Sequence, residues 1–113
     1  MVTERKVILQ KGTRDILPCR VAENTTLAYV IWHKGSTFVT ADLLVELYFL
    51  RGTPIKDGDG YTRGSYDIHD NYSLVIENVS VKDNEYFFCE VVTLSNEIYT
   101  NQTNVIVFGK HAR

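Results

Sequence analysis

The sequence predicts an all-β protein that folds as a two-sheet antiparallel sandwich. Helical patterns are nearly absent, because no long stretch repeats apolar residues at spacings of three and four with capping residues. Short runs rich in β-branched, aromatic and aliphatic residues recur instead, separated by turn-forming residues. Eight or nine short strands joined by turns are typical of such a sandwich. A chain of 113 residues has room for one domain of this kind.

The strand-like runs follow one another with little connecting sequence. A polar loop at 23–26 separates the second run from the third, and Asp70-Asn71 makes a tight turn between two later runs. The stretch 53–60 contains Pro54 and ends in Asp-Gly-Asp-Gly, so it is predicted to be a loop that holds one short edge strand at most. The predicted strands are 6–10, 16–22, 28–33, 43–50, 62–68, 72–77, 85–93 and 98–108.

Composition and charge exclude several partners. Twelve Lys and Arg residues against fourteen Asp and Glu residues give a formal net charge of -2, which is no nucleic-acid footprint and no basic membrane patch. The longest mostly apolar stretch, 43–50, contains Glu46 and is far shorter than the roughly 20 residues of a membrane span. We therefore expect no nucleic-acid partner and no insertion of this segment into a membrane.

Catalytic and metal-binding motifs are equally weak. The histidines His33, His69 and His111 are scattered and accompany no nucleophile motif. The Asp57 loop resembles a fragment of a calcium loop, but Ile68 stands where the closing glutamate of that loop belongs. The expectation is a protein that is not an enzyme and that carries no cofactor and no metal.

The two cysteines lie in separate strand-like runs. Cys19 follows Pro18, and Cys89 lies among aromatic and β-branched residues. Without a Cys-x-x-Cys pair they make a poor zinc site and a poor redox motif. A disulfide between strands is their simplest use, with two buried free thiols as the alternative. A disulfide would place the chain in an oxidising compartment.

Acceptor triplets for N-linked glycans support the same compartment. The sequence contains four Asn-x-Ser/Thr triplets, which begin at Asn24, Asn71, Asn78 and Asn101. If glycans are attached, these asparagines face water. Together with the cysteine pair, the triplets predict an extracellular location, either on a cell-surface ectodomain or on a secreted protein. The N-terminal residues lack the apolar core of a signal peptide.

A more specific pattern surrounds the cysteines. The only tryptophan, Trp32, lies between them in a strand-like run. Leu74, Ile76, Val79 and Asp83 then precede Cys89 at spacings that resemble those of a variable-type (V-set) immunoglobulin domain, from strand E into strand F. In that family a strand tryptophan packs against a disulfide that joins the two sheets. The resemblance covers essentially the whole chain, with residues 1–108 as the domain and 109–113 as a linker or tail.

The resemblance implies roles for individual residues. Trp32, Leu74, Ile76, Val79 and Phe87 are expected in the core. Arg63 is placed to form an ion pair with Asp83 at the corner between strands E and F. The length between Trp32 and Cys89 implies the two additional strands C′ and C″ of a V-type immunoglobulin-like sandwich.

Two positions depart from the family pattern. Phe87 replaces the usual corner tyrosine, whose lost hydrogen bond is worth on the order of 1 kcal/mol, and Glu85 replaces the usual corner glycine. Phe108-Gly109 also lies too far from Cys89 to match the joining segment of antigen receptors. The resemblance therefore implies a non-rearranging immune-type receptor or a cell-adhesion molecule.

Strand alternation predicts which face binds a partner. With Val30 and Trp32 inward, Ile31 points outward, and the outward residues of strand F give the G-F-C-C′ sheet an apolar exterior. Exposed apolar patches commonly mark partner sites. The alternatives are that a neighbouring strand covers the patch or that isolated apolar residues are tolerated there. The predicted partner-binding residues are Ile31, His33, Phe88, Glu90, Val92 and Tyr99.

The short loop between the last two strands is the second candidate site, and it comprises Leu94, Ser95, Asn96 and Glu97. The predicted function is an extracellular recognition domain that binds a protein partner, or a second copy of itself, through the G-F-C-C′ sheet and the tip loops. The alternatives are a module that binds a glycan or another small ligand, and a structural spacer in a multidomain ectodomain.

Overall fold

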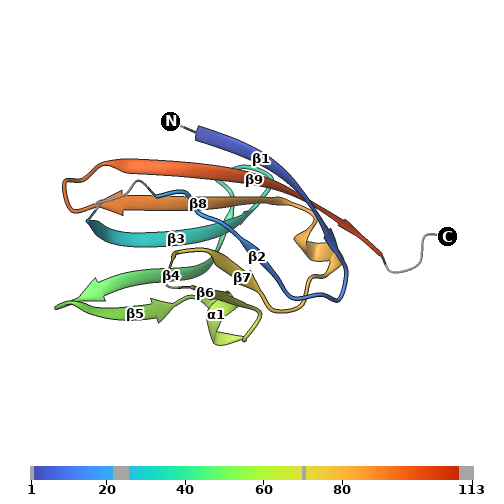
Figure 1. The fold of residues 1–113 in the computed structure, drawn as a ribbon, viewed down its shortest axis with the longest axis horizontal. Helices are drawn as coiled ribbons and strands as arrows, with labels where there is room; N and C mark the ends of the chain where they lie inside the picture. The colour runs from blue at the N-terminus through green and yellow to red at the C-terminus, as the bar shows by residue number, and fades with distance from the viewer. Residues whose placement is uncertain (1, 22–25, 70, 110–113) are drawn as a thin grey trace.

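The chain folds into two β-sheets that lie face to face, as the ribbon in Figure 1 shows for this computed structural model. Residues 2–21, 26–69 and 71–109 are described, with side chains from residue 5 onward. The six-stranded sheet has the order β1-β9-β8-β3-β4-β5 and the three-stranded sheet the order β2-β7-β6. The elements are β1 (Val2–Gln10), β2 (Asp15–Leu17), β3 (Leu27–Gly35), β4 (Asp42–Leu50), β5 (Thr53–Asp57), α1 (Asp59–Thr62), β6 (Tyr66–Ile68), β7 (Leu74–Ile76), η1 (Val81–Asp83), β8 (Tyr86–Thr93) and β9 (Ile98–Phe108).

This architecture confirms the predicted all-β sandwich with the two additional strands. In family terms, β9, β8, β3 and β4 are strands G, F, C and C′, and β5 is C″. β4 and β5 are joined by a turn in which Arg51 and Gly52 both have positive φ angles, 53° and 80°. This is the left-handed geometry of a two-residue turn that matches the twist of paired strands. The sequence predicted at most one short edge strand in residues 53–60, and β5 is that strand.

Some strands are shorter than predicted. The second strand ends at Leu17 because Pro18 has no N–H to donate to the ladder. The predicted strand 62–68 shrinks to β6, since α1 occupies the residues before it. Gly58 lets α1 approach β4, because a Cβ atom there would lie 2.7 Å from the carbonyl oxygen of Leu44. At both places backbone chemistry limits the strand.

The core forms around the cysteine pair and the indole. Cys19 and Cys89 form a disulfide with their Cα atoms 5.9 Å apart, so the alternative of two free thiols is excluded. Trp32 is fully buried, and its indole Nε1 donates a hydrogen bond of 2.9 Å to the carbonyl oxygen of Tyr72. The remaining residues expected in the core are also buried: Leu74, Ile76, Val79 and Phe87.

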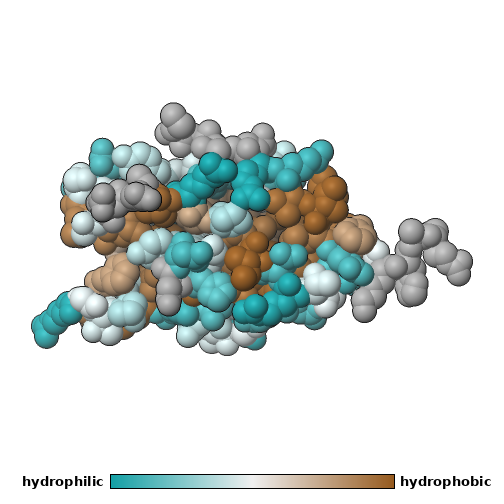
Figure 2. All heavy atoms as spheres, viewed as in Figure 1, coloured by the Kyte–Doolittle hydropathy of each residue, from teal (hydrophilic) through white to brown (hydrophobic). Residues whose placement is uncertain are grey.

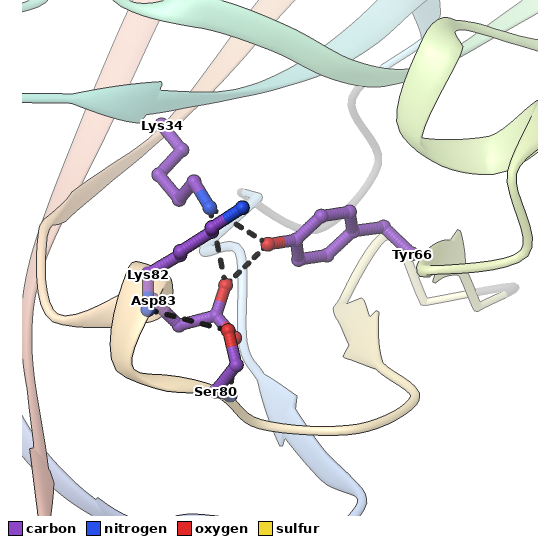
Figure 3. A network of polar contacts seen from close by, with 5 residues as sticks. All are labelled: Lys34, Tyr66, Ser80, Lys82 and Asp83. Carbon is purple, nitrogen blue, oxygen red and sulfur yellow. Dashed lines mark hydrogen bonds and ion pairs between the residues drawn. The ribbon is translucent and has the colours of Figure 1, made fainter.

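The ion pair at the corner involves a different cation from the one expected. Lys34 on β3, not Arg63, places its Nζ 3.3 Å from Oδ1 of Asp83 (Figure 3). Arg63 lies exposed after α1, and no ion pair joins it to Asp83 in the described part of the chain. The correction has a geometric cause: Lys34 enters from the inward face of β3, two residues after Trp32, whereas the turn at α1 carries Arg63 to the surface.

Asp83 is 2% exposed and receives further hydrogen bonds. The backbone N–H of Ser80 donates to Oδ2 at 2.8 Å, and the hydroxyl of Tyr66 donates to Oδ1. Lys34 Nζ also donates to the Tyr66 hydroxyl oxygen at 3.0 Å. Burial, and then the Asp83 carboxylate, raise the pKa of Tyr66 above its ordinary value. The network thus ties β3, β6 and the E–F corner together with each buried polar group paired.

Candidate interaction surface

The outer sheet face is the side of the six-stranded sheet that points away from the three-stranded sheet. Ile31 and His33 on β3 point to it, as do Phe88, Glu90 and Val92 on β8, because their strand neighbours Trp32, Cys89 and Val91 are in the core. The register pairs His33 with Phe88 and Ile31 with Glu90. Alternation therefore brings five of the six predicted partner-binding residues to one face.

Phe88 and Val92 are nevertheless not exposed, which corrects the expectation of an open apolar face. Phe88 is 3% exposed and Val92 is 7% exposed. The ring of Phe38 lies edge-on to that of Phe88 at a centroid distance of 5.7 Å, and Tyr86 stacks on it from the same strand at 6.3 Å. Phe38, in the connection between β3 and β4, covers Phe88, whereas the alternative given above was cover by a neighbouring strand.

The covering segment, residues 36–41 between β3 and β4, is itself apolar at the surface. Val39 is 92% exposed, and Phe38 is exposed on its other side although it packs on Phe88. Hydrogen bonds hold the loop: the Thr37 and Thr40 hydroxyls lie 2.7 Å apart, and the Thr40 N–H donates to the Thr37 hydroxyl at 3.3 Å. The 36–41 loop thus presents two adjacent apolar side chains on a fixed base.

Sequence reasoning missed Phe38 and Val39. The one signal was their position, an apolar pair in a short connection between two strand-like runs. Adjacent apolar residues in a connection can form a small apolar patch, and exposed apolar patches commonly mark partner sites. Phe38 finds part of that surface on Phe88, whereas Val39 is left in solvent.

Charged side chains on β3, β4, β5 and β8 border the apolar part of the outer sheet face. Oε1 of Glu90 lies 3.5 Å from Nε2 of His33, which is within ion-pair range but long for a good hydrogen bond, and Nε2 has no closer partner. Glu46 and Asp57 face each other on β4 and β5. His33 also packs edge-on against Phe38 at 5.4 Å. An apolar centre with a charged border is the usual composition of a protein interface.

Tyr99 was assigned to the wrong face. It pairs with Val91, a core residue, and so its side chain lies on the inward side of β9, opposite Phe88. It remains exposed because it stands near the end of the sheet. The Glu97 carboxylate raises the pKa of the Tyr99 phenol. Tyr99 therefore belongs with the tip of the domain.

The tip loop Leu94, Ser95, Asn96 and Glu97 is exposed throughout. It is a tight hairpin turn in which the Asn96 N–H donates to the Thr93 carbonyl at 3.0 Å and Asn96 adopts a φ of 66°. Asparagine tolerates this left-handed conformation. The Glu97 N–H donates to the Thr93 hydroxyl at 3.0 Å. This short, hydrogen-bonded loop presents four exposed residues at the end of the sandwich.

The predicted glycosylation sites differ in their surroundings. Asn71 and Asn78 are exposed, while Asn24 lies outside the described residues. The amide Nδ2 of Asn101 donates to the carbonyl oxygen of Arg20 at 3.1 Å, next to the disulfide. Because a glycan attaches at Nδ2, an attached sugar at Asn101 would lie beside the Arg20 carbonyl and the disulfide, so the glycan expected there remains a prediction.

The remaining features of the described residues are their surface composition, their potential metal ligands and the length of their helices. Figure 2 shows apolar and polar side chains mixed over the face where β2, β6 and β7 lie, with a larger apolar area toward the end where β9 leaves the sandwich. Within residues 2–21, 26–69 and 71–109 there is no group of three or more potential metal ligands. No helix in these ranges is long and apolar enough to cross a membrane.

Comparisons with known proteins agree with this geometry. The family model for the Immunoglobulin V-set domain matches residues 2–108, and the chain belongs to that family. Comparison with curated protein sequences found no match. The comparisons indicate no enzyme family, and V-set domains are generally binding and adhesion modules.

Solved structures share the fold at low sequence identity. The crystal structure of murine CEACAM1b matches with a TM-score of 0.74 and 20% identity, over 90% of this chain and 50% of that one. The extracellular domains of the voltage-gated sodium channel beta4 subunit match with a TM-score of 0.67 and 15% identity, over 98% of this chain and 90% of theirs. The chain thus spans about half the length of the CEACAM1b chain.

Proposed function

We propose that this domain is an extracellular recognition module that binds a protein partner through the outer sheet face, with the 36–41 loop at the centre of contact. The observation that carries the proposal is Val39, which is 92% exposed beside a partly exposed Phe38. Because Phe38 rests on Phe88, the loop can bury apolar area against a partner without a large rearrangement.

The acidic border gives the contact its selectivity. Glu90 and Glu46 flank the apolar centre, and His33 lies between Phe38 and Glu90. Charged groups at the border of an interface affect the association rate and the choice of partner more than the affinity. The anchors of the contact are then Phe38 and Val39, and Phe88 supports them from below.

A second copy of this chain is the first partner to test. The sodium channel beta4 ectodomains are described as parallel homodimers that explain a role in cell–cell adhesion. For this chain, self-pairing is supported by the shared fold and by an apolar patch on the face that β3, β4 and β8 form. The disulfide supports an extracellular location, where such adhesion operates.

Analytical ultracentrifugation tests self-pairing directly. The wild-type chain has a mass of 12.9 kDa, and a dimer at micromolar concentration would double it. Val39→Glu places a charge in the centre of contact and is expected to leave a monomer. Ile16→Glu is the matched control, because Ile16 is an exposed isoleucine on β2 in the other sheet, and this variant should still dimerise.

Two results would contradict this proposal. If the wild type stays monomeric up to about 1 mM, the second copy is not the partner, since this corresponds to less than about 4 kcal/mol of association free energy. Binding of multivalent wild-type domain to cells then tests a different protein partner. If Val39→Glu binds as well as the wild type in that assay, the 36–41 loop is not the contact.

A further inference from the structure

A cleft of about 370 Å³ opens between the two sheets, away from the outer sheet face. It lies where the edge strands β5 and β6 face each other across the side of the sandwich. Leu47 and Ile68 are its buried floor, while the rings of Phe49 and Tyr61 stand at its sides and are 38% and 37% exposed. The full lining is Leu47, Phe49, Pro54, Lys56, Tyr61, Ile68, His69 and Tyr72.

Tyr72 holds an unfavourable backbone conformation at this cleft. Its φ angle is 71°, in the left-handed region that glycine or asparagine adopts with less strain. Its N–H donates to the carbonyl of His69 at 2.8 Å, which closes the turn between β6 and β7. The side chain packs against the core and lines the cleft. Strain retained by a bulky residue is a feature of functional sites.

Among the described residues around the cleft, one lysine and one aspartate pair with each other. Nζ of Lys56 lies 2.9 Å from Oδ1 of Asp67 and 5.9 Å from the centre of the Tyr61 ring. His69 adds a further polar side chain at the opening. Aromatic rings that carry no net charge between them, with donors and acceptors beside them, fit a neutral pyranose. Its C–H face packs on a ring while its hydroxyl and acetamide groups form hydrogen bonds.

The nearest source of such a sugar is the chain itself. Asn71 begins an Asn-x-Ser triplet, is exposed, and lies between His69 and Tyr72, both of which line the cleft. Oδ1 of Asn71 accepts a hydrogen bond from the N–H of Ser73 at 3.2 Å. This hydrogen bond engages Oδ1 of Asn71, and Nδ2, the atom to which a glycan attaches, takes no part in it.

We propose that Asn71 carries an N-linked glycan and that its first N-acetylglucosamine residues occupy this cleft, covering Phe49, Tyr61 and Tyr72. The left-handed conformation of Tyr72 is then explained by function, because the turn places Asn71 beside the cleft and the Tyr72 ring in its lining. The inference rests on the extracellular location proposed above, since N-linked glycans are added to chains that enter the secretory pathway.

The experiment uses the chain secreted from mammalian cells, with its glycans trimmed to a single N-acetylglucosamine. Peptide mass spectrometry measures occupancy at Asn71 and at Asn78, the control triplet. NMR then detects contacts between the sugar protons and the aromatic ring protons. We expect Asn71 to be occupied and its sugar to show contacts to Tyr61 and Tyr72. Tyr61→Ser should remove the contacts to position 61 and lower the sugar's ring-current shifts.

Thermal unfolding provides a second readout. The sugar at Asn71 is expected to raise the Tm of the wild type by about 3 °C relative to Asn71→Gln, and to raise that of Tyr61→Ser by less than about 1 °C. Asn78→Gln should leave the Tm within about 1 °C of the wild type. A double-mutant cycle, in which the glycan and the Tyr61 ring are removed singly and together, cancels the effect that either substitution has on the turn itself.

A free sugar distinguishes the two possible sources. N,N′-diacetylchitobiose is titrated into Asn71→Gln while the cleft resonances are followed. Weak, millimolar shifts at the cleft together with tethered contacts in the wild type support the proposal. Cleft shifts without tethered contacts would mean that the site takes sugar from outside, and the proposal fails. Absence of a glycan at Asn71, with or without one at Asn78, also refutes it, and neither result bears on the proposed contact at the 36–41 loop, which ultracentrifugation tests separately.

Discussion

The buried network at the E–F corner gives the sharpest stability prediction. Lys34 supplies the only side-chain cation that contacts Asp83 in the described residues, with its Nζ 3.3 Å from Oδ1. Lys34→Met keeps the length of the side chain and removes the charge. Asp83, 2% exposed, would keep the Ser80 N–H and the Tyr66 hydroxyl but lose its counter-ion.

Removing one partner of a buried ion pair typically costs about 3 to 5 kcal/mol. Because Asp83 retains two hydrogen bonds, we expect the lower value, about 3 kcal/mol. With an m-value of about 1.5 kcal/mol/M, this lowers the midpoint of urea unfolding by about 2 M. Fluorescence of the buried Trp32 reports the transition.

Combining Lys34→Met with Asp83→Asn removes both charges and leaves an amide whose oxygen can accept from the Ser80 N–H while its Nδ2 donates to the Tyr66 hydroxyl oxygen. The double variant should therefore be less destabilised than the sum of the single variants, by at least about 1.5 kcal/mol. Arg63→Met is the matched control and should change stability by less than about 0.5 kcal/mol, since Arg63 is exposed. A coupling below about 0.5 kcal/mol, or an equal loss in Arg63→Met, would refute the assignment of Lys34.

Three further predictions follow from the same structure. Folding raises the pKa of Tyr66 above its ordinary 10.0. The stability that its protonated hydroxyl contributes is therefore fully present below pH 10 and is lost above it by about 1.4 kcal/mol per pH unit. Tyr66→Phe should show a shallower decline of the free energy of urea unfolding between pH 9 and 11. Reduction of the Cys19–Cys89 disulfide, which joins residues 70 apart in sequence, should cost about 4 kcal/mol at neutral pH, and an unchanged Tm in reductant would contradict this. Asn101 should be less occupied than Asn78 in secreted protein by peptide mass spectrometry, because its Nδ2 lies 3.1 Å from the Arg20 carbonyl oxygen and 3.9 Å from Cys19 Sγ; equal occupancy at the two triplets would contradict this.

The sequence was sufficient for the fold because its strongest signals are covalent or periodic. Cys19, Trp32 and Cys89 define the centre of the sandwich, and the alternation of Leu74 and Ile76 sets the inward face of β7. These features depend on residue identity and on a period of two, both of which are visible in one sequence. The limits of β2 and β6 were less accurate, since a proline and a short helical turn end the pairing locally.

The sequence predicted to which face the side chains of the candidate surface point, but not how exposed they are. Alternation placed Phe88 on the outer sheet face correctly, yet exposure depends on where the 36–41 loop goes after it leaves β3. No local pattern gives that path, because it is decided by the contact of Phe38 with Phe88. Tyr99 failed for a related reason: its face depends on the register of β9 against β8, and a shift of one residue reverses the side.

The corner ion pair shows how a family role can pass to another residue. A buried carboxylate at position 83 needs a cation and hydrogen-bond donors, whichever strand provides them. Here the cation comes from β3 through Lys34, and β6 contributes the Tyr66 hydroxyl. Arg63 therefore lies at the surface, where it lines a groove between β4 and α1. Because Asp83 requires a cation but not a particular residue, Lys34→Arg should keep most of the stability that Lys34→Met loses, whereas no substitution at position 63 should recover it in Lys34→Met.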